Sequence, residues 1–296
     1  MHGVVALLYH GVGTAAGPAG GGRWTVAPGE LEAQLEAIAA AGGAMDPRRV
    51  ATGDSGVAIT FDGGDRSVLE EAFPRLARRG WVGALFVATG RLGRPGWLAP
   101  DEVVALRAAG WLVGSGGHTG RPLPPLGPAA LREDLSRSRD VLAPLLGSPP
   151  AHLAFPGGRS SPRAEDVARA LGFTTLWSSS PGVNAAMIPR GALRRTAVRR
   201  GEPLDRFRRI VRGDPLTHAA GRLDGAAREV ARRALGDARW DAVVRPRWEA
   251  VSDRLLLALE RARHFSIATS TGVAESSDAS ARGSTPTRNP RDPPFT

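Results

Sequence analysis

The stretch AITFDGGDRS, residues 58–67, ends an apolar run with an aspartate, two glycines and a second aspartate. A short apolar run bounded in this way is typical of a buried strand. Asp62 then stands at the carboxyl end of the strand, followed by Gly63, Gly64 and Asp65. In parallel sheets the chemistry collects at the carboxyl ends of the strands, which makes Asp62 a candidate catalytic residue. An aspartate in this position can equally cap the helix that follows.

Apolar runs alternate with helix-like segments on both sides of this stretch. The expected strands cover residues 4–9, 57–61, 83–88, 111–115, 152–156 and 174–179, and the expected helices cover 28–43, 66–80, 98–110, 127–147 and 161–172. Several of these helices end at a glycine, which favours the left-handed conformation of a C-terminal cap. Strands that alternate with helices predict parallel pairing, in a barrel or in a doubly wound sheet.

Three further strand ends carry polar side chains. His10 follows the first strand in LLYHGV, Arg159 follows the fifth in FPGGRSSP, and His118 lies in the loop VGSGGHTGRPLPPLG, residues 113–127. Each position has a structural interpretation when taken alone, since an arginine after two glycines is typical of a surface turn. Four such positions at the same ends of parallel strands favour a functional site.

Composition limits the function classes. A chain of 296 residues with 42% hydrophobic content can bury a large core, and the absence of cysteine excludes disulfides and thiolate metal sites. The net charge of +10 would suit a nucleic-acid partner. Every one of the basic residues is arginine, however, and the arginines are spread along segments that also carry Asp and Glu. We interpret them as a solvated surface, expect no nucleic-acid partner, and keep nucleic-acid binding only as a distant alternative.

The two ends of the chain carry less information about function. MHGVVALLYHGVG has neither the basic leader nor the cleavage site of a signal peptide, so we expect a cytoplasmic protein, and no apolar run is long enough for a membrane span. We expect one domain over residues 1–213. Residues 214–265 predict an Arg-rich helical extension interrupted at Pro246, and residues 266–296, rich in Ser, Thr, Pro and Gly, predict a disordered tail.

The order of these motifs resembles the polysaccharide deacetylase family, whose shared unit is the NodB homology domain of carbohydrate esterase family 4. The motifs are YHGV, TFD-x-G, the glycine-rich loop ending in RPLPPLG, and FPGGR, and the resemblance runs from about residue 4 to residue 212. It implies an α/β fold, a distorted (β/α) barrel, and hydrolysis of the acetamide group on N-acetylglucosamine-type glycans. It also implies that Asp62 is the catalytic base. We expect Arg159 to orient Asp62 and His10 to form a polar contact near the site.

The chain departs from the family's pattern where the resemblance places a divalent metal such as zinc. The expected ligands are an aspartate and two histidines, and their positions here are Gly63, Gly116 and Gly120. Glycine has no side-chain donor, so no metal cofactor is predicted for this chain. Asp65 and His118 are the remaining side chains that could contact a metal at this end. A single imidazole does not hold zinc against solvent, so we do not expect them to form a metal site. The change of Gly63 to Asp and of Gly116 and Gly120 to His is expected to restore the metal site, provided that the loop follows the family's path.

Two functions stay open on the sequence. The first is a deacetylase of this family whose activity is severely impaired, because the metal supplies the activated water and polarises the carbonyl. The second is a non-catalytic sugar-binding pseudoenzyme of the same fold, with an N-acetylated glycan or oligosaccharide as its ligand. In that case His118, Trp97, Trp111 and Trp177 are candidates for substrate binding, although packing in the core explains the tryptophans equally well.

Overall fold

The computed structural model describes residues 3–13, 22–50, 52, 54–123, 127–185, 191–245, 247–248 and 251. Backbone contacts divide the chain into two units, Met1–Ala226 and Ala227–Thr296, and each is described by itself. The predicted tail, residues 266–296, and part of the predicted helical extension lie outside the described residues. The candidate site belongs entirely to the first unit.

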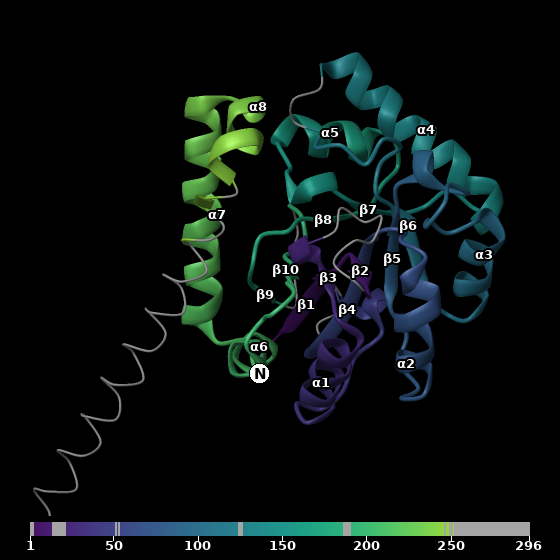
Figure 1. Ribbon diagram of the computed structural model, residues 1–296. Helices are drawn as coiled ribbons and strands as arrows, with labels where there is room; N and C mark the ends of the chain where they lie inside the picture. The colour runs from purple at the N-terminus through teal and green to yellow at the C-terminus, as the bar shows by residue number, and fades with distance from the viewer. Residues whose placement is uncertain are drawn as a thin grey trace, which may run out of the picture. The chain divides into compact units, whose positions relative to one another are not determined.

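A curled, mostly parallel sheet forms the centre of the first unit (Figure 1). Its strands follow the spatial order β10-β1-β4-β5-β6-β7-β8, and β9 pairs with β1 in the antiparallel direction. The six predicted strands are confirmed as β1 (Val4–Tyr9), β4 (Gly56–Gly63), β5 (Ala84–Val87), β6 (Leu112–Ser115), β7 (His152–Ala154) and β8 (Thr175–Trp177). The strands that the sequence did not predict contain two residues each: β2 (Gly11–Val12), β3 (Thr25–Val26), β9 (Val183–Asn184) and β10 (Thr196–Ala197).

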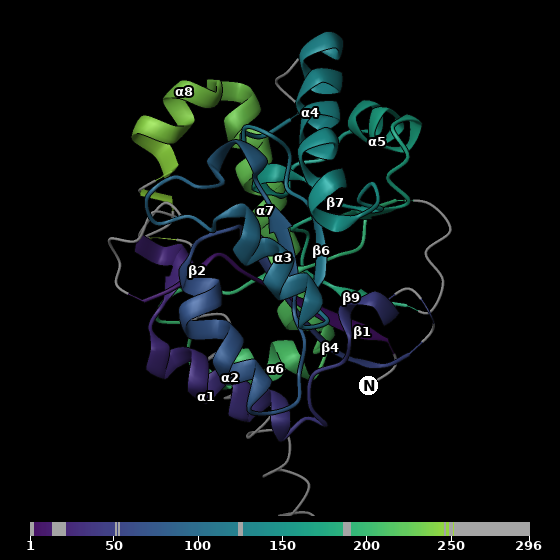
Figure 2. The same cartoon turned by 90° about the vertical axis from the view of Figure 1, so that its right-hand side faces the viewer.

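Helices pack on the outside of this sheet (Figures 1 and 2): α1 (Pro28–Ala39), α2 (Phe73–Ala77), α3 (Pro100–Ala108), α4 (Pro128–Leu146), α5 (Pro162–Ala170) and α6 (Leu204–Val211). Four of them begin with proline, whose missing N–H is not needed in the first turn of a helix. The predicted helix 66–80 begins as a π-helix, Val68–Ala72, before α2. Pro74 has no N–H to continue an α-helical ladder at this point, which accounts for the wider turn.

The segment after β9 closes the sheet into a barrel. Leu193 bridges to Trp177 of β8, and Thr196 and Ala197 pair with β1. The two ends of the strand order are therefore joined through residues 193–197. The predicted distorted (β/α) barrel is confirmed, and its closing segment is an irregular five-residue stretch.

Alternate strand residues face two separate cores. One set packs under the helices, where Leu31 and Leu35 of α1 and Phe207 of α6 are fully buried. The other set fills the barrel interior with Val4, Ala6, Ala58, Ala84, Phe86, Leu112, Ala154, Trp177 and Leu193. Side chains two residues apart in a strand share a face, so Thr60 and Asp62 continue the interior face that Ala58 begins.

The predicted helical extension starts with α7 (Pro215–Leu235), followed by α8 (Asp237–Arg239) and a π-helix, Trp240–Val244. Pro246, where the sequence predicted an interruption, lies outside the described residues. None of the helices in the described part of the chain combines the length and the apolar character needed to cross a membrane.

Candidate functional site

The predicted site residues meet at one edge of the barrel. His10 follows β1, Asp62 lies at the end of β4, the loop containing His118 follows β6, and Arg159 follows β7. These strands run in the same direction, so their carboxyl ends lie at the same edge. The four positions therefore lie at one edge of the sheet, and His10 is near enough to Asp62 for the carboxylate charge to act on its imidazole.

Asp62 is held by a buried arginine that the sequence analysis did not select. Arg195 Nη1 donates to Asp62 Oδ1 at 2.6 Å, and Nη2 donates to Oδ2 at 2.9 Å. The Arg195 side chain is 0% exposed and that of Asp62 is 14% exposed. Arg195 also donates to the carbonyl oxygen of Ser178 and to Thr60 Oγ1, and its guanidinium covers the ring of Phe86. These contacts fix the orientation of the carboxylate and neutralise its charge.

Both carboxylate oxygens thus bond to Arg195, and an orienting role of Arg159 stays a prediction. The residue was missed because Arg195 is one of four arginines in the run RRTAVRR, residues 194–200, and nothing in that run predicts a strand. The burial of Leu193 and of Arg195, two positions apart, reflects the period of an extended segment facing the barrel interior. This short alternation is the sequence signal that distinguishes Arg195, which faces the barrel interior, from the other arginines of the run.

The opposite side of the site contains the three glycines and a second cation. A Cβ atom on Gly63 would lie 3.3 Å from the ring of Trp97 and 3.9 Å from Arg91 Nη1. A Cβ atom on Gly120 would lie 3.2 Å from Arg91 Nη2. The Arg91 guanidinium stacks on Trp97 at 4.5 Å from the ring centroid. Arg91 thus borders two of the positions where the resemblance places metal ligands.

The third of these positions is confined by the backbone of the sheet. The N–H of Gly116 donates to the carbonyl of Val87, and a Cβ atom on Gly116 would lie 3.0 Å from the carbonyl oxygen of Phe86. Both Gly63 and Gly120 have positive φ angles, +98° and +67°. L-amino acids with side chains rarely adopt such angles, so the present backbone favours glycine at these two positions.

The donors in this part of the site do not fit a divalent metal. The described residues contain no group of three or more His, Asp or Glu side chains arranged to hold one. Asp65, the weak candidate, accepts hydrogen bonds from the N–H and the hydroxyl of Ser67 in the next turn. A guanidinium beside Gly63 and Gly120 adds a repulsive charge. We therefore assign no reaction step to a metal.

His10 shares its surroundings with both arginines. Burial lowers the pKa of its imidazole, the charges of Arg195 and Arg91 lower it further, and Asp62 acts in the opposite direction. The ring lies 5.7 Å from that of Trp24 and makes no hydrogen bond in the described part of the chain. A neutral imidazole at this position can donate one hydrogen bond and accept another from a bound ligand.

The four candidate substrate-binding residues differ in their surroundings. His118 Nδ1 lies 2.9 Å from Thr89 Oγ1, and its backbone N–H donates to Asp134, so both ends of the residue are held. Trp97 is partly exposed and faces Arg91. The prediction that Trp177 stacks on a sugar is wrong, because its side chain is 0% exposed and packs against Phe86. Trp111, at 3% exposure, is also buried, and its ring packs against Phe61 and Phe73.

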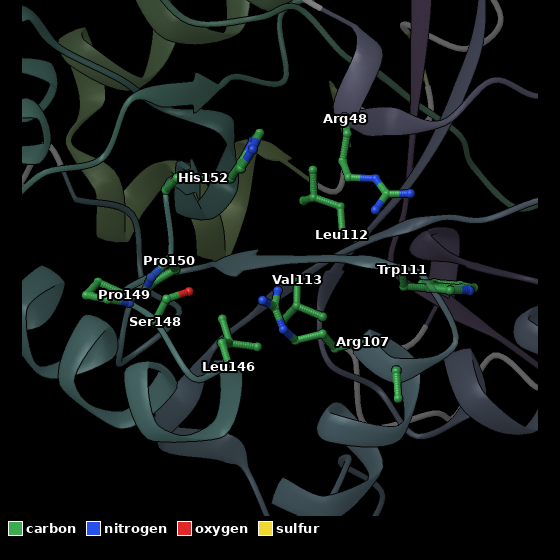
Figure 3. Close-up of a pocket in the computed structure, with 12 residues that line it drawn as sticks. Arg48, Arg107, Trp111, Leu112, Val113, Leu146, Ser148, Pro149, Pro150 and His152 are labelled. Carbon is green, nitrogen blue, oxygen red and sulfur yellow. The ribbon is translucent and has the colours of Figure 1, made fainter.

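A cavity of about 480 Å³ opens at the other end of the barrel, beside the amino ends of β6 and β7 (Figure 3). Arg48, Arg107 and His152 surround it, with Leu112 and Val113 in its wall. Trp111 lines this cavity, whereas Asp62, His10, His118 and Arg159 do not. The pKa of His152 is lowered to about 4 by burial, so its imidazole is neutral at neutral pH.

Comparison with known proteins agrees with the fold. Residues 49–176 match the family model described as polysaccharide deacetylase. IcaB from Ammonifex degensii has 24% sequence identity and a TM-score of 0.61, over 75% of this chain and 98% of that chain. The deacetylase PplD from Streptococcus pyogenes, solved in complex with acetate, has 18% identity and a TM-score of 0.63, over 71% of this chain and 98% of that chain. No curated protein matches the chain.

The match over residues 49–176 covers β4 to β8, the strands whose ends build most of the site. The similarity to the two solved structures covers a larger share of the chain, 75% and 71%. Residues 49–176 therefore match the model of a polysaccharide deacetylase domain, and the similarity to the two solved structures supports the same fold.

Proposed function

We propose that this chain binds an N-acetylated glycan at the carboxyl end of the barrel without hydrolysing it by the family's metal-dependent route. The observation that supports this most directly is the position of Arg91, whose guanidinium borders Gly63 and Gly120. A cation of the protein takes the place that the resemblance gives to a metal ion. The ligand class, N-acetylated glycans, follows from the family.

Hydrolysis of an acetamide requires more of the site than binding of the glycan does. Hydrolysis of an acetamide needs a nucleophilic water and a stabilised oxyanion, and a metal supplies both by lowering the pKa of its bound water. Arg91 can donate hydrogen bonds to an oxygen of the ligand, which binds and orients the glycan. A guanidinium does not bind water as a Lewis acid, so it leaves the nucleophile unactivated. Asp62 keeps the position of a base, while Arg195 engages both of its oxygens.

A second candidate function is slow hydrolysis with Asp62 as the base and no metal. The retained Asp62–Arg195 pair favours it, because a carboxylate held in one orientation at the site is what a general base requires. The two functions differ in one measurable product, acetate.

The test measures binding and acetate release in the same sample. Purified protein is titrated with chitin oligosaccharides by calorimetry, with and without added zinc, and acetate is then quantified. We expect saturable binding in both conditions and no acetate above a protein-free blank. Zinc-dependent acetate release that Asp62→Asn abolishes would contradict the proposal. Zinc-independent release abolished by the same variant would establish the second candidate, and absence of binding would remove glycan recognition altogether.

Trp97 provides a variant with a matched control. Trp97→Leu removes the partly exposed ring at the site and is expected to weaken oligosaccharide binding, since ring stacking contributes to carbohydrate contacts. Trp81→Leu removes a partly exposed tryptophan that precedes β5 at the opposite end of the barrel, where Arg79 stacks on it. It is expected to leave binding unchanged. Equal effects of the two variants would contradict the placement of the sugar beside Trp97.

A further inference from the structure

Arg91 is a partly buried cation with no anion beside it. In the described part of the chain its guanidinium forms no ion pair and no hydrogen bond, and the side chain's one assigned contact is the stack on Trp97. Burial lowers its pKa and the charge of Arg94 lowers it further, while no carboxylate acts in the opposite direction. Burying part of a cation without a counter-ion costs free energy, so the arrangement is complete only when an anion binds.

The nearby carboxylates are already engaged. Asp62 pairs through both oxygens with Arg195, and Asp65 accepts from Ser67. Within the cluster of Arg91, Arg195 and Asp62, Arg91 is the cation that no carboxylate contacts. One unmatched guanidinium suits a single carboxylate, and a dianion such as phosphate would meet more repulsion from Asp62 and Asp65.

The geometry around the guanidinium selects the shape of that anion. Trp97 covers one face of the guanidinium plane, which leaves the N–H groups along its edge to make contacts. Two parallel N–H groups match the two oxygens of a carboxylate. Gly120 matters here, because a Cβ atom at this position would lie within 3.2–3.3 Å of the guanidinium. Glycine at positions 63 and 120 therefore keeps this edge of the site free of protein side chains.

We propose that Arg91 and Trp97 bind the carboxylate of an acidic sugar in an N-acetylated glycan, at the place where the resemblance puts a metal ion. The inference rests on the proposed glycan-binding function and adds the chemical class of the glycan. A neutral glycan reaches the same site but leaves Arg91 without a counter-ion. The acidic glycan supplies the carboxylate that Arg91 lacks.

The cavity at the other end of the barrel is the competing place for an anion (Figure 3). Arg48 is already paired there with Asp46, through Nε–Oδ contacts of 2.8 and 2.9 Å. Arg107 has no ion pair among the described residues, but its side chain is exposed and solvated. Arg107 is therefore the matched control for Arg91: the same charge and the same chain, at the opposite end of the barrel.

The experiment uses two ligands that differ in charge alone. One is an oligosaccharide of alternating N-acetylglucosamine and glucuronic acid, and the other is the same oligosaccharide with its carboxylates reduced to primary alcohols. Binding of both to the full chain is measured by calorimetry. We expect the acidic ligand to bind about 10-fold more tightly, as one charge-assisted bidentate contact implies.

Variants then locate the preference. Arg91→Gln should reduce the ratio of the two affinities to about one, and Arg107→Gln should leave it at about 10-fold. Arg91→Lys, which keeps the charge and protects the fold should Arg91→Gln be unstable, should lose most of the preference because an ammonium neither stacks nor binds bidentately. A preference that survives in both Arg91 variants, or disappears in Arg107→Gln, would overturn the proposal.

The ligands also separate this inference from the function on which it rests. Equal binding of the acidic and the reduced oligosaccharide by the parent chain contradicts carboxylate recognition and leaves glycan binding intact. Binding of neither ligand, together with no binding of chitin oligosaccharides, contradicts the proposed function itself.

Discussion

Strand β5 has an arginine stacked on a tryptophan near each of its ends, and the two stacks differ in one respect. Near the amino end, Arg79 lies over Trp81 and forms an ion pair with Glu32 of α1. Past the carboxyl end, Arg91 lies over Trp97 and has no carboxylate partner in the described part of the chain. The stack that serves the fold is neutralised within the chain. The stack at the site is not, and this difference favours a ligand there.

The largest effect on stability is expected when the metal-ligand side chains that the resemblance implies are introduced at the carboxyl end of the barrel. The triple change Gly63→Asp, Gly116→His and Gly120→His places side chains at two positive φ angles and against the carbonyl of Phe86. Strain and overpacking of about 1–3 kcal/mol at each position predict a loss of roughly 3–9 kcal/mol in the free energy of unfolding. Urea denaturation measures it.

The structure thus limits the sequence-based expectation that these three changes restore a metal site, because the loop would have to move and Arg91 would have to leave. Adding Arg91→Ala to the triple variant is expected to raise zinc affinity. A triple variant that keeps the parent's stability and binds one zinc per chain with Arg91 present would contradict the arrangement described for this end of the barrel.

The second effect concerns the paired cation at the same end. Arg195→Met leaves Asp62 buried without its partner, and removal of one member of a buried ion pair costs about 3–5 kcal/mol. The double variant Asp62→Asn with Arg195→Met should recover part of that loss, since it leaves no unpaired charge. Denaturation midpoints of the three proteins provide the measurement. If the single and the double variant were equally unstable, the ion pair would not be the cause.

The third effect depends on pH and involves the amino end of the barrel interior. His152 has a pKa of about 4 in the folded chain, against 6.5 ordinarily, and its Nδ1 accepts a hydrogen bond from Trp177 Nε1. Above pH 6.5 the imidazole is neutral in both states, so it contributes no pH dependence. Between pH 6.5 and pH 4 the unfolded chain takes up a proton that the folded chain excludes, and stability falls by up to about 3 kcal/mol.

His152→Gln should remove this part of the pH dependence, because glutamine can accept the bond from Trp177 without titrating. Unfolding free energies at pH 7 and pH 4.5 for the parent and the variant test it. An identical loss of stability in both proteins would assign the effect to other groups, of which His10 and His118 also have lowered pKa values.

The smallest effect compares the two stacks of β5 directly. Arg79→Met breaks the pair with Glu32 and should cost about 0.5–1 kcal/mol. Arg91→Met breaks no ion pair and should change stability by no more than about 0.5 kcal/mol. Denaturation of both variants measures the difference. We expect it to be small, with the larger loss of stability in Arg79→Met. A larger loss for Arg91→Met would indicate that Arg91 serves the fold.

The sequence predicted the fold because the long strands are apolar throughout and the helices carry clear boundary residues. It predicted Asp62 and His10 at the site, because a polar residue directly after a buried strand has few other places to lie. It did not predict Arg195, whose role depends on a five-residue closing segment too short to show a period. It also assigned Trp177 to the ligand, because the sequence alone does not show which face of a three-residue strand an aromatic ring occupies.

The role of Arg91 could not be predicted either. Its position follows from a turn after β5, Thr89–Arg91, that is tied to the loop after β6 by the N–H groups of Thr89 and Gly90, which donate to the carbonyls of Gly117 and His118. Contacts between two loops distant in sequence leave no local pattern. The glycines at 63 and 120 showed that ligand side chains were missing, but not what lies beside them.

The central claim, that an arginine takes the place of the metal ion, is tested most directly by titration of zinc into the parent chain and Arg91→Ala, each first dialysed against a chelator. The parent should show no saturable zinc binding at the site and release no acetate from chitin oligosaccharides in the presence of zinc. Stoichiometric zinc binding by the parent that Asp62→Asn weakens and Arg91→Ala leaves unchanged, accompanied by acetate release, would contradict the claim.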